Sequence, residues 1–409
     1  MIESRDTSIC ELPKQRRQIG WGAVLASAAA VATIAAPHLA AAQATANPYA
    51  DVHYEHDSNV FRAQNSHANL IAIGDPKLAD NDLKAVAGVD GTYLWSEQKL
   101  TATLEGRRYV YDHFSQLDHN EYLADVALKW KTTSLLDGTV EARQEQLMAP
   151  FTLGNSTQLT VDVDRKISGG LNLNINPDWR LESSVYSHHL KSPLQNFPDF
   201  VEREVGTQLA LLNRSVAHLT YGITVDHISG RFENAPDVGT YNQTDAQLTA
   251  NYAVSALTSF KGALGYTKRD QVADSLSAVT GMLGYTRQLT GKTSFTFNLV
   301  RAVNSYVAAG GSEVDTSATA GLNWQSTYKL LVAINGGYTH STFAGQFVPG
   351  SLTAGRADNL PTGSLNINYQ IFRHTLLKAY LQRQSRSSNI DIYQFGDTIV
   401  GIEARVSLR

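Results

Sequence analysis

The chain has 409 residues and a net charge of −4, and its charged residues amount to 18 %, below the quarter that is usual in soluble proteins. This weak charge argues against a nucleic-acid partner. The only cysteine, Cys10, precedes a long apolar stretch, so neither a disulfide framework nor thiol chemistry is expected.

Residues 1–44 are predicted to be a secretory signal peptide. Basic residues between positions 14 and 17 precede an Ala-rich apolar stretch over 19–36, and small residues at 42 and 44 fit a cleavage site. We therefore expect export through the Sec route and a mature chain, 45–409, that forms a single domain. An N-terminal anchoring helix is the alternative, but no charged stop-transfer cluster follows the apolar stretch.

The mature chain alternates apolar and polar residues from end to end, which predicts β-strands and no helix. Around Pro177 and Asp178, for example, two alternating runs flank residues that favour a turn. The predicted strands are 49–62, 83–96, 98–112, 119–132, 136–148, 157–176, 178–191, 200–213, 216–231, 241–254, 257–270, 275–289, 292–304, 313–326, 329–343, 359–372, 374–387 and 396–409.

The connections between these segments alternate between short and long. The alternation predicts a transmembrane up-and-down antiparallel β-barrel of about 16–18 strands, with periplasmic turns and longer outer loops, as in bacterial outer-membrane proteins. Tight turns are predicted near 96–97, 177–178, 213–215, 290–292 and 373–374. Longer polar loops are predicted at 63–82, 190–199, 231–240, 304–312, 343–358 and 388–395.

Four tryptophans share one strand end and one strand face. Each lies near a predicted short turn, on the parity of the apolar residues: Trp95, Trp130, Trp179 and Trp324. Amphipathic rings at a common end are typical of an interfacial girdle, so the apolar face is predicted to meet lipid. Three tyrosines are expected at the opposite rim: Tyr111, Tyr266 and Tyr338. A large soluble β-sandwich or lectin-like fold is the alternative, but it gives no reason for the shared tryptophan end.

The opposite parity is polar and carries acids and bases in close succession. In a barrel such a face lines a watery lumen, and mixed charges suit hydrated cargo without strong selection for either sign. The candidate lumen-lining residues are Glu105, Arg107, Asp125, Lys129, Glu141, Arg143, Asp245, Glu403 and Arg405.

The first predicted strand carries the sequence YEHDSNVFR, from Tyr54 to Arg62. Through Tyr54, Asp57-Ser58-Asn59 and Val60-Phe61 it resembles the opening strand of the β-barrel porin 2 family, and within that family the EpsL-type outer-membrane proteins of exopolysaccharide gene clusters. The resemblance implies a role in moving newly made polysaccharide across the outer membrane, together with periplasmic export components. It carries over no functional residues.

A catalytic interpretation rests on His227 and Ser229, which share the lipid-side face of one strand near its outer end. An outer-membrane lipid hydrolase would also need a third residue to orient the imidazole and an oxyanion site. Asn242 could be that third residue, but nothing in the sequence fixes the pairing. An ordinary polar pair beside a loop is the simpler interpretation, so no catalytic residue is assigned.

Two other pairs invite a chemical interpretation. His188 and His189 are adjacent, so they point to opposite faces of a strand and cannot hold one metal ion together. Glu202 and Glu204 share a face and could form a paired-carboxylate glycosidase site, although acids are common on lumen walls. No metal, cofactor or enzymatic activity is therefore predicted.

The residues alone predict an outer-membrane pore with a polar, mixed-charge lumen. With the resemblance, the prediction becomes a conduit in exopolysaccharide export or biosynthesis. A general diffusion porin for small hydrophilic solutes is the alternative, and a lipid hydrolase is the third possibility. The expected partners are outer-membrane lipid and either polysaccharide or small polar solutes.

Overall fold

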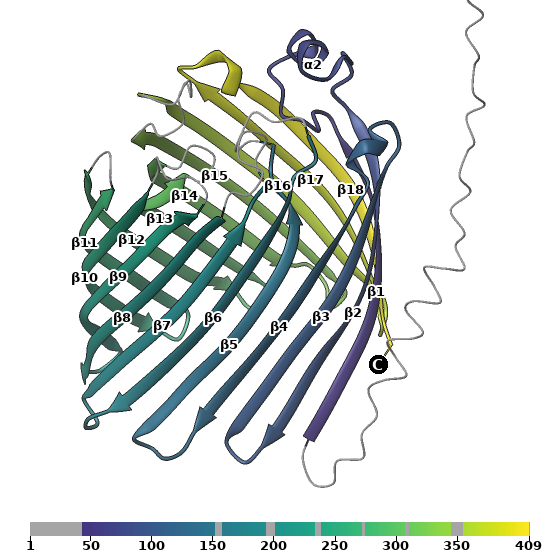
Figure 1. Cartoon of the computed structure of the whole chain (residues 1–409). Helices are drawn as coiled ribbons and strands as arrows, with labels where there is room; N and C mark the ends of the chain where they lie inside the picture. Colours follow the sequence, from purple (N-terminus) through teal and green to yellow (C-terminus); the bar gives the residue numbers. More distant parts are fainter. Residues whose placement is uncertain are drawn as a thin grey trace, which may run out of the picture.

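The computed structural model describes residues 43–151, 158–193, 201–233, 239–271, 275–306, 311–344 and 355–408. Eighteen strands form one antiparallel sheet, in which strands adjacent in sequence pair and β1 also pairs with β18. The sheet therefore closes into a barrel (Figure 1). The predicted signal peptide lies outside the described residues, except for Gln43 and Ala44, which begin β1.

The strands follow the alternating segments of the sequence, and each is 13 to 16 residues long. They are β1 (Gln43–Asp57), β2 (Asp80–Trp95), β3 (Gln98–Tyr111), β4 (His119–Lys131), β5 (Leu136–Met148), β6 (Val161–Asn174), β7 (Trp179–Lys191), β8 (Val201–Val216), β9 (Leu219–Glu233), β10 (Thr240–Ser255), β11 (Thr258–Gln271), β12 (Ser275–Thr290), β13 (Thr293–Tyr306), β14 (Gly311–Gln325), β15 (Leu330–Ala344), β16 (Ala357–Phe372), β17 (Thr375–Ser388) and β18 (Phe395–Ser407). Within the described parts of the connections lie the helices α2 (Ser66–Ile73), η1 (Ser115–Leu117) and η3 (Asp391–Tyr393).

The predicted all-β, up-and-down antiparallel barrel is confirmed, with eighteen strands. Three predicted boundaries are wrong. The first strand begins at Gln43 and not at residue 49. It ends at Asp57 and does not continue to residue 62, because the Asp57 carboxylate accepts a hydrogen bond from the Asn59 N–H (2.7 Å) and turns the chain. The turn predicted at 213–215 comes later, at Ala217 and His218, after a register shift in β8.

The prediction of no helix is wrong for the loop between β1 and β2. Helix α2 begins after Asn65, whose side chain accepts a hydrogen bond from the Ala68 N–H (2.9 Å), and ends at Gly74, which has a φ of 77°. Its eight residues make about two turns, too few to show an apolar periodicity, so the two caps were the only signals in the sequence. Among the described residues, no helix is long and apolar enough to cross a bilayer.

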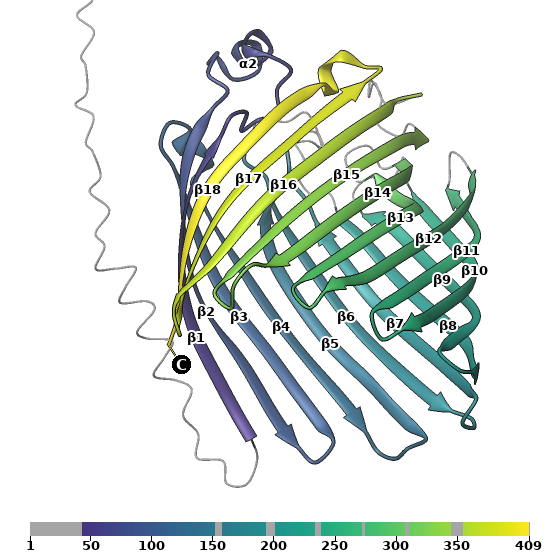
Figure 2. The ribbon, with the colours of Figure 1, turned by 180° about the vertical axis from the view of Figure 1, so that it is seen from behind.

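The connections are sorted to two ends of the barrel, as the alternation of loop lengths predicted. Among the described residues, α2, η1 and η3 lie at one end of the barrel, and the short turns lie at the other end (Figures 1 and 2). In outer-membrane barrels the short turns face the periplasm, so the α2 end is taken as the outer end.

The two faces of the sheet differ sharply in chemistry. The outward positions form a belt of exposed apolar side chains, including Leu171, Val185, Leu209, Ile223, Leu248, Leu264, Leu283 and Ile402. The four tryptophans lie on this outward face at the short-turn end. Trp95, Trp179 and Trp324 are exposed, and the ring of Trp130 lies over Gly138.

The tyrosines expected at the opposite rim divide between the two faces. Tyr266 and Tyr338 are exposed on the outward face. The expectation for Tyr111 is wrong, because this residue is buried among the loop side chains Val60, Phe61 and Phe114. Tyr111 shares the parity of Glu105 and Arg107 on β3, so it faces inward.

An inward tyrosine braces the wall at three places by reaching across a glycine. Tyr380 on β17 lies over Gly401 of β18 and donates a hydrogen bond to Glu55 of β1 (2.5 Å). The same register relation holds for Tyr49, Gly88 and Glu105 (2.5 Å) on β1, β2 and β3, and for Tyr241, Gly230 and Glu204 on β10, β9 and β8. The glycine is required because a Cβ there would overlap the ring. The first brace spans the closing pair of strands.

We predict that Gly401→Ala destabilises the barrel. Its Cβ would lie 2.3 Å from Tyr380 Cζ, so the ring must leave Glu55, and we expect a loss of about 1–3 kcal/mol. The measurement is the temperature at which the folded, fast-migrating form disappears on a denaturing gel. Gly336→Ala is the matched control, since its Cβ would have no atom within 4 Å. Equal midpoints for the two variants would contradict the brace.

Candidate functional site: the lumen and its outer mouth

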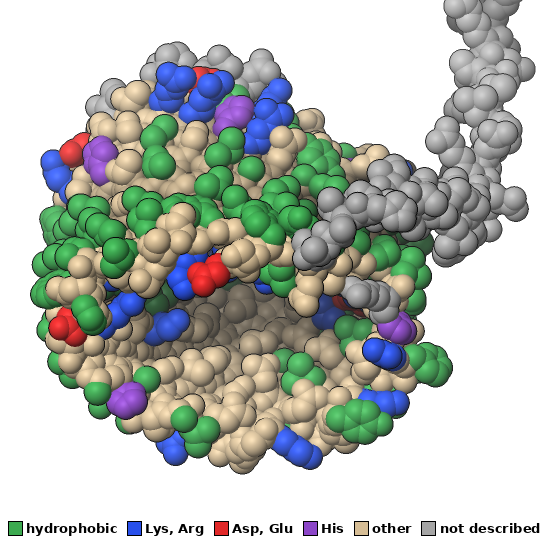
Figure 3. Space-filling view, turned by 90° about the horizontal axis from the view of Figure 1, so that it is seen from below, with side chains coloured by type: hydrophobic (Ala, Val, Ile, Leu, Met, Phe, Trp, Pro, Cys, Tyr) green, Lys and Arg blue, Asp and Glu red, His purple; other side chains and the backbone are tan. Residues whose placement is uncertain are grey.

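The barrel encloses a hollow that opens at the short-turn end (Figure 3). All nine candidate lumen residues occupy inward positions, on the face opposite the tryptophans. Several form ion pairs along the wall: Arg143 lies 2.7 Å from Glu145 and 3.7 Å from Asp125, and Arg107 lies 3.3 Å from Glu121 and also pairs with Glu105.

The inner wall over β1–β7 is charged, with more carboxylates than cations. This excess differs from the balanced mixture expected from the sequence, and it favours cations over anions in an open passage. The inward acids are Asp51, Glu55, Asp57, Asp80, Asp82, Asp90, Glu105, Glu121, Asp125, Asp137, Glu141, Glu145, Asp162, Asp164 and Glu182. The inward bases are Lys84, Lys99, Arg107, Lys129, Lys131, Arg143, Lys166 and Arg180. We call this part the charged wall.

The inner wall over β12–β16 has a different composition. Apart from Glu313, Asp315 and Asp358 near the outer rim, the described inward positions of these strands carry no charge. Amides, hydroxyls and glycines dominate this neutral wall, including Thr296, Asn298, Thr319, Gly321, Asn323, Asn335, Gly337, Thr362, Ser364, Asn366 and Asn368. The lumen therefore presents two chemically distinct sides to a solute.

At the outer end, an aromatic cluster packs against the inward side of β3. Phe61 of the β1–β2 loop lies 4.8 Å from Phe114 and 5.0 Å from Phe151, measured between ring centroids. These three rings come from three different loops, and together with Val60 and Leu117 they form a small buried core. The cluster holds the loops together over this side of the mouth.

A second, polar cluster draws β13 toward β8. Ser305 Oγ donates to Glu202 (3.0 Å) and accepts from Arg269 Nη2 (2.7 Å), while the Tyr241 hydroxyl donates to Glu202 (2.8 Å). The Arg269 guanidinium lies 3.7 Å from the centre of the Tyr241 ring. Because four strands separate β8 from β13 in the sheet, the wall must fold inward here. The β12–β13 ladder ends at Gly281 and Arg301, which lets the outer part of β13 bend away.

A third cluster lies where β16 begins. The guanidinium of Arg356 is almost completely buried, 3.5 Å from the ring of Tyr393 and 4.3 Å from that of Phe343. Its Nε donates to both oxygens of Asp358 at 3.0 Å. Arg386 joins the cluster by donating to the Tyr393 carbonyl (2.5 Å). The three clusters together narrow the outer mouth over different strands.

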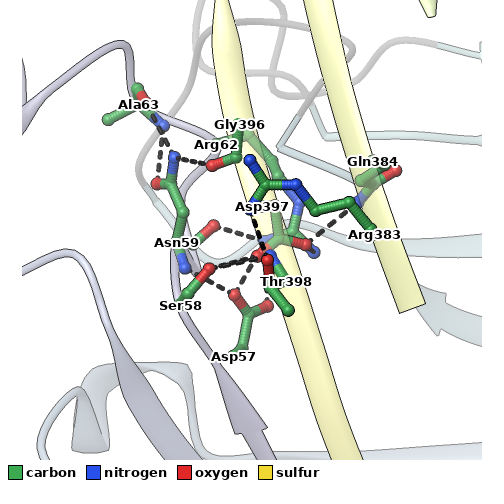
Figure 4. Close-up of polar contacts among 10 residues, drawn as sticks. All are labelled: Asp57, Ser58, Asn59, Arg62, Ala63, Arg383, Gln384, Gly396, Asp397 and Thr398. Carbon is green, nitrogen blue, oxygen red and sulfur yellow. Dashed lines mark hydrogen bonds and ion pairs between the residues drawn. The ribbon is translucent and has the colours of Figure 1, made fainter. Parts of the chain in front are cut away.

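The motif Asp57-Ser58-Asn59 forms a clip at the seam between β1 and β18 (Figure 4). Arg62 lies 2.8 Å from Asp57 and 3.2 Å from Asp397 of β18, whose side chain is fully buried. Asn59 donates to the carbonyls of Ala63 (2.8 Å) and Gly396 (3.0 Å). The clip fixes the loop that carries α2 to the closing strand.

The catalytic candidates are not assembled in the way that a hydrolase requires. Asn242 lies opposite Ser229 in the β9–β10 ladder, and Thr244 lies opposite His227. His227 Nδ1 is 3.0 Å from Thr244 Oγ1, so its described hydrogen bond is to Thr244 and does not activate Ser229.

The other chemical candidates lie on the inner wall. His188 faces inward between Asp164 (3.0 Å) and Glu204 (3.2 Å), as its parity required. Glu202 and Glu204 belong to the polar cluster of β8 and β13, so their oxygens are already engaged by Tyr241. Glu202 and Glu204 are therefore tied into this cluster and do not form a free carboxylate pair.

Asp51, His53 and Glu403 are close enough to share a metal ion, with ligand atoms within 4.8 Å of one another. The sequence did not single them out as a set, because Glu403 comes from the other end of the chain. Lys378 lies 3.2 Å from Glu403, and Arg405 lies 3.6 Å from Asp51. Each of the two carboxylates therefore has a cationic side chain within 4 Å.

Residues 231–408, from the end of β9 through β18, match the family model described as "Putative beta-barrel porin 2". This match agrees with three observations on the structure: the closed sheet, the outward apolar belt and the polar lumen. The chain is an outer-membrane β-barrel of porin-like architecture. No match to a curated protein was found.

Two solved structures similar to the porin-like barrel come from Pseudomonas aeruginosa. OpdK, determined with vanillate, is 12 % identical, with 88 % of this chain and 98 % of that chain covered and a TM-score of 0.48. OccK2 (OpdF), determined in complex with glucuronate, is 11 % identical, with 90 % and 99 % covered and a TM-score of 0.49.

We predict that Arg62→Met loosens the seam of the porin-like barrel. The substitution leaves the buried Asp57 and Asp397 without their shared cation, which typically costs roughly 3–5 kcal/mol. Thermal loss of the folded gel form and protease sensitivity of the α2 loop are the measurements. Lys268→Met is the control, because the pair of Lys268 with Asp270 is solvent-exposed and worth at most about 1 kcal/mol. Equal effects of the two substitutions would show that the clip does not stabilise the seam.

Proposed function

We propose that this barrel is the outer-membrane conduit of an exopolysaccharide export system. The observation that carries the proposal is the shape of the lumen. It is hollow at the periplasmic end (Figure 3) and narrowed at the outer end by clusters of loop and rim side chains. A flexible polymer arriving from the periplasm meets a wide entrance, and the narrowed mouth limits the return of solutes from outside.

The lining supports the same proposal. A polysaccharide moves as a hydrated chain whose hydroxyl groups exchange hydrogen bonds with its surroundings, and amide and hydroxyl side chains can offer both donors and acceptors. The neutral wall supplies such groups on several adjacent strands, and the ion pairs of the charged wall keep the opposite side hydrated. The resemblance of the first strand to EpsL-type proteins points to the same cargo.

A general diffusion porin for small hydrophilic solutes is the second candidate. The family description and the ion-paired wall favour it, because mixed charges suit small polar molecules of many kinds. The two proposed functions predict different effects of removing the barrel. Loss of an export conduit leaves polysaccharide in the periplasm, and loss of a general porin slows the uptake of small solutes.

Deletion of the gene should abolish polysaccharide at the cell surface and leave polymer in the periplasm, because a conduit acts after synthesis. Surface staining and periplasmic extraction are the measurements. Restoring the intact chain, or the variant with His227→Ala and Ser229→Ala, should return the surface polymer, since neither residue is assigned chemistry. Normal surface polymer with slower uptake of small solutes would instead establish the general porin.

A further inference from the structure

We infer that the neutral wall of β12–β16, extended by β17, is a binding track for uncharged sugar residues. This inference rests on the proposed function and names the class of saccharide that the conduit carries. Its starting point is the absence of charge from the described inward positions of β12–β16 below the outer rim, beside the dense charges of β1–β7. The neighbouring β17 adds the inward amide Gln382, and its inward cation Lys378 is paired with Glu403 (3.2 Å). A random distribution of polar residues around the barrel would not place the charged side chains on one group of strands and the amides and hydroxyls on another.

The neutral wall is recessed at inward glycines, against which polar side chains lie flat. A Cβ at Gly321 would be 2.8 Å from Asn335 Oδ1 and 3.0 Å from Thr296 Oγ1, so only glycine leaves these groups in place. A Cβ at Gly337 would be 2.7 Å from Thr362 Oγ1 in the same way. The glycines therefore widen the lumen on this side and hold amide and hydroxyl groups along its surface.

The recess is large enough for a sugar residue. It forms a hollow of about 420 Å³ lined by residues of β13–β17, among them Asn298, Asn335, Ser364 and Gln382. Arg383, the charged residue of the described lining, has the outward parity of β17 and donates to Thr398 Oγ1 (2.5 Å). This volume lies in the range typical of sites for small ligands, roughly 300–1,000 Å³. Asn335 Nδ2 donates to Ser364 Oγ at 3.3 Å, a long bond that a sugar hydroxyl can replace.

The chemistry of the track favours weak and exchangeable binding. Each neutral hydrogen bond to a sugar hydroxyl contributes only about 1 kcal/mol net, so a polymer can be held and still advance. Conduction generally requires binding that is favourable enough to enter and weak enough to leave. The carboxylate excess of the charged wall disfavours anionic polymers, so uncharged sugar segments are the cargo that fits both walls.

The test uses the full barrel in detergent micelles and maltohexaose, a neutral linear glucose hexamer, as the probe. Binding is measured by saturation-transfer NMR with titration. We expect the variant Asn298→Leu, Asn335→Leu, Gln382→Leu to bind at least about tenfold more weakly, because it removes about three hydrogen-bonding groups. The matched control replaces Gln208, Gln247 and Asn251, inward amides of β8 and β10, by Leu, and its affinity should stay within about twofold.

Folding of each variant is checked by its heat-modifiable gel mobility, so that lost binding is not lost structure. A hexamer of galacturonic acid, which is anionic, should bind more weakly than maltohexaose. The track would be overturned by absent binding to the intact barrel, by equal losses in both triple variants, or by tighter binding of the anionic hexamer. Planar-bilayer conductance separates the two proposals. Sugar binding without conductance would overturn the conduit and support the track, and conductance without sugar binding would do the reverse.

Discussion

The closing pair of strands is the constraint on which the rest of the structure depends. A bilayer supplies no hydrogen-bonding partner to an open strand edge, and each unsatisfied backbone group there costs several kcal/mol. Pairing of β1 with β18, from Tyr49 with Ser407 to Asp57 with Ile399, removes both edges. The brace from Tyr380 to Glu55 and the clip around Arg62 both cross this seam, so side chains reinforce the pairing that the membrane requires.

In the closed barrel the register of each strand pair determines which residues point inward and which point outward. The two faces of the sheet therefore carry different side chains. The outward face is uniform because lipid accepts only apolar groups, with aromatic rings at the interface. The inward face is free to vary, and here it varies by strand: charges gather on β1–β7, and amides and hydroxyls gather on β12–β16. Function therefore resides in the side chains of the wall, on a backbone shared by many pores.

Much of the fold could be read from the sequence because its signals are local. Period-2 alternation and turn residues recur along the chain, which predicted the strands and gave each lumen candidate a parity. The side-chain contacts at the outer mouth could not be predicted in this way. The hydrogen bond between Tyr380 and Glu55 joins residues 325 positions apart, and Ser305 meets Glu202 only because β13 bends inward. Tyr111 was assigned to the rim from its position near a strand end, although its parity, shared with Glu105 and Arg107, already indicated the inward face. The sequence contains the neutral wall as uncharged alternating segments over residues 317–325, 330–339 and 360–370, but its significance required their side-by-side placement.

The central claim is that alternate residues meet water inside and lipid outside, on both the charged and the neutral wall. Cysteine labelling tests it most directly, in a chain whose Cys10 is changed to Ser and that carries one new cysteine at a time at Glu141, Val140, Ser364 or Leu365. In proteoliposomes, a charged water-soluble thiol reagent should label the cysteines at 141 and 364, and a lipophilic maleimide should be needed at 140 and 365. The reverse alternation, or equal labelling of neighbours, would contradict the account.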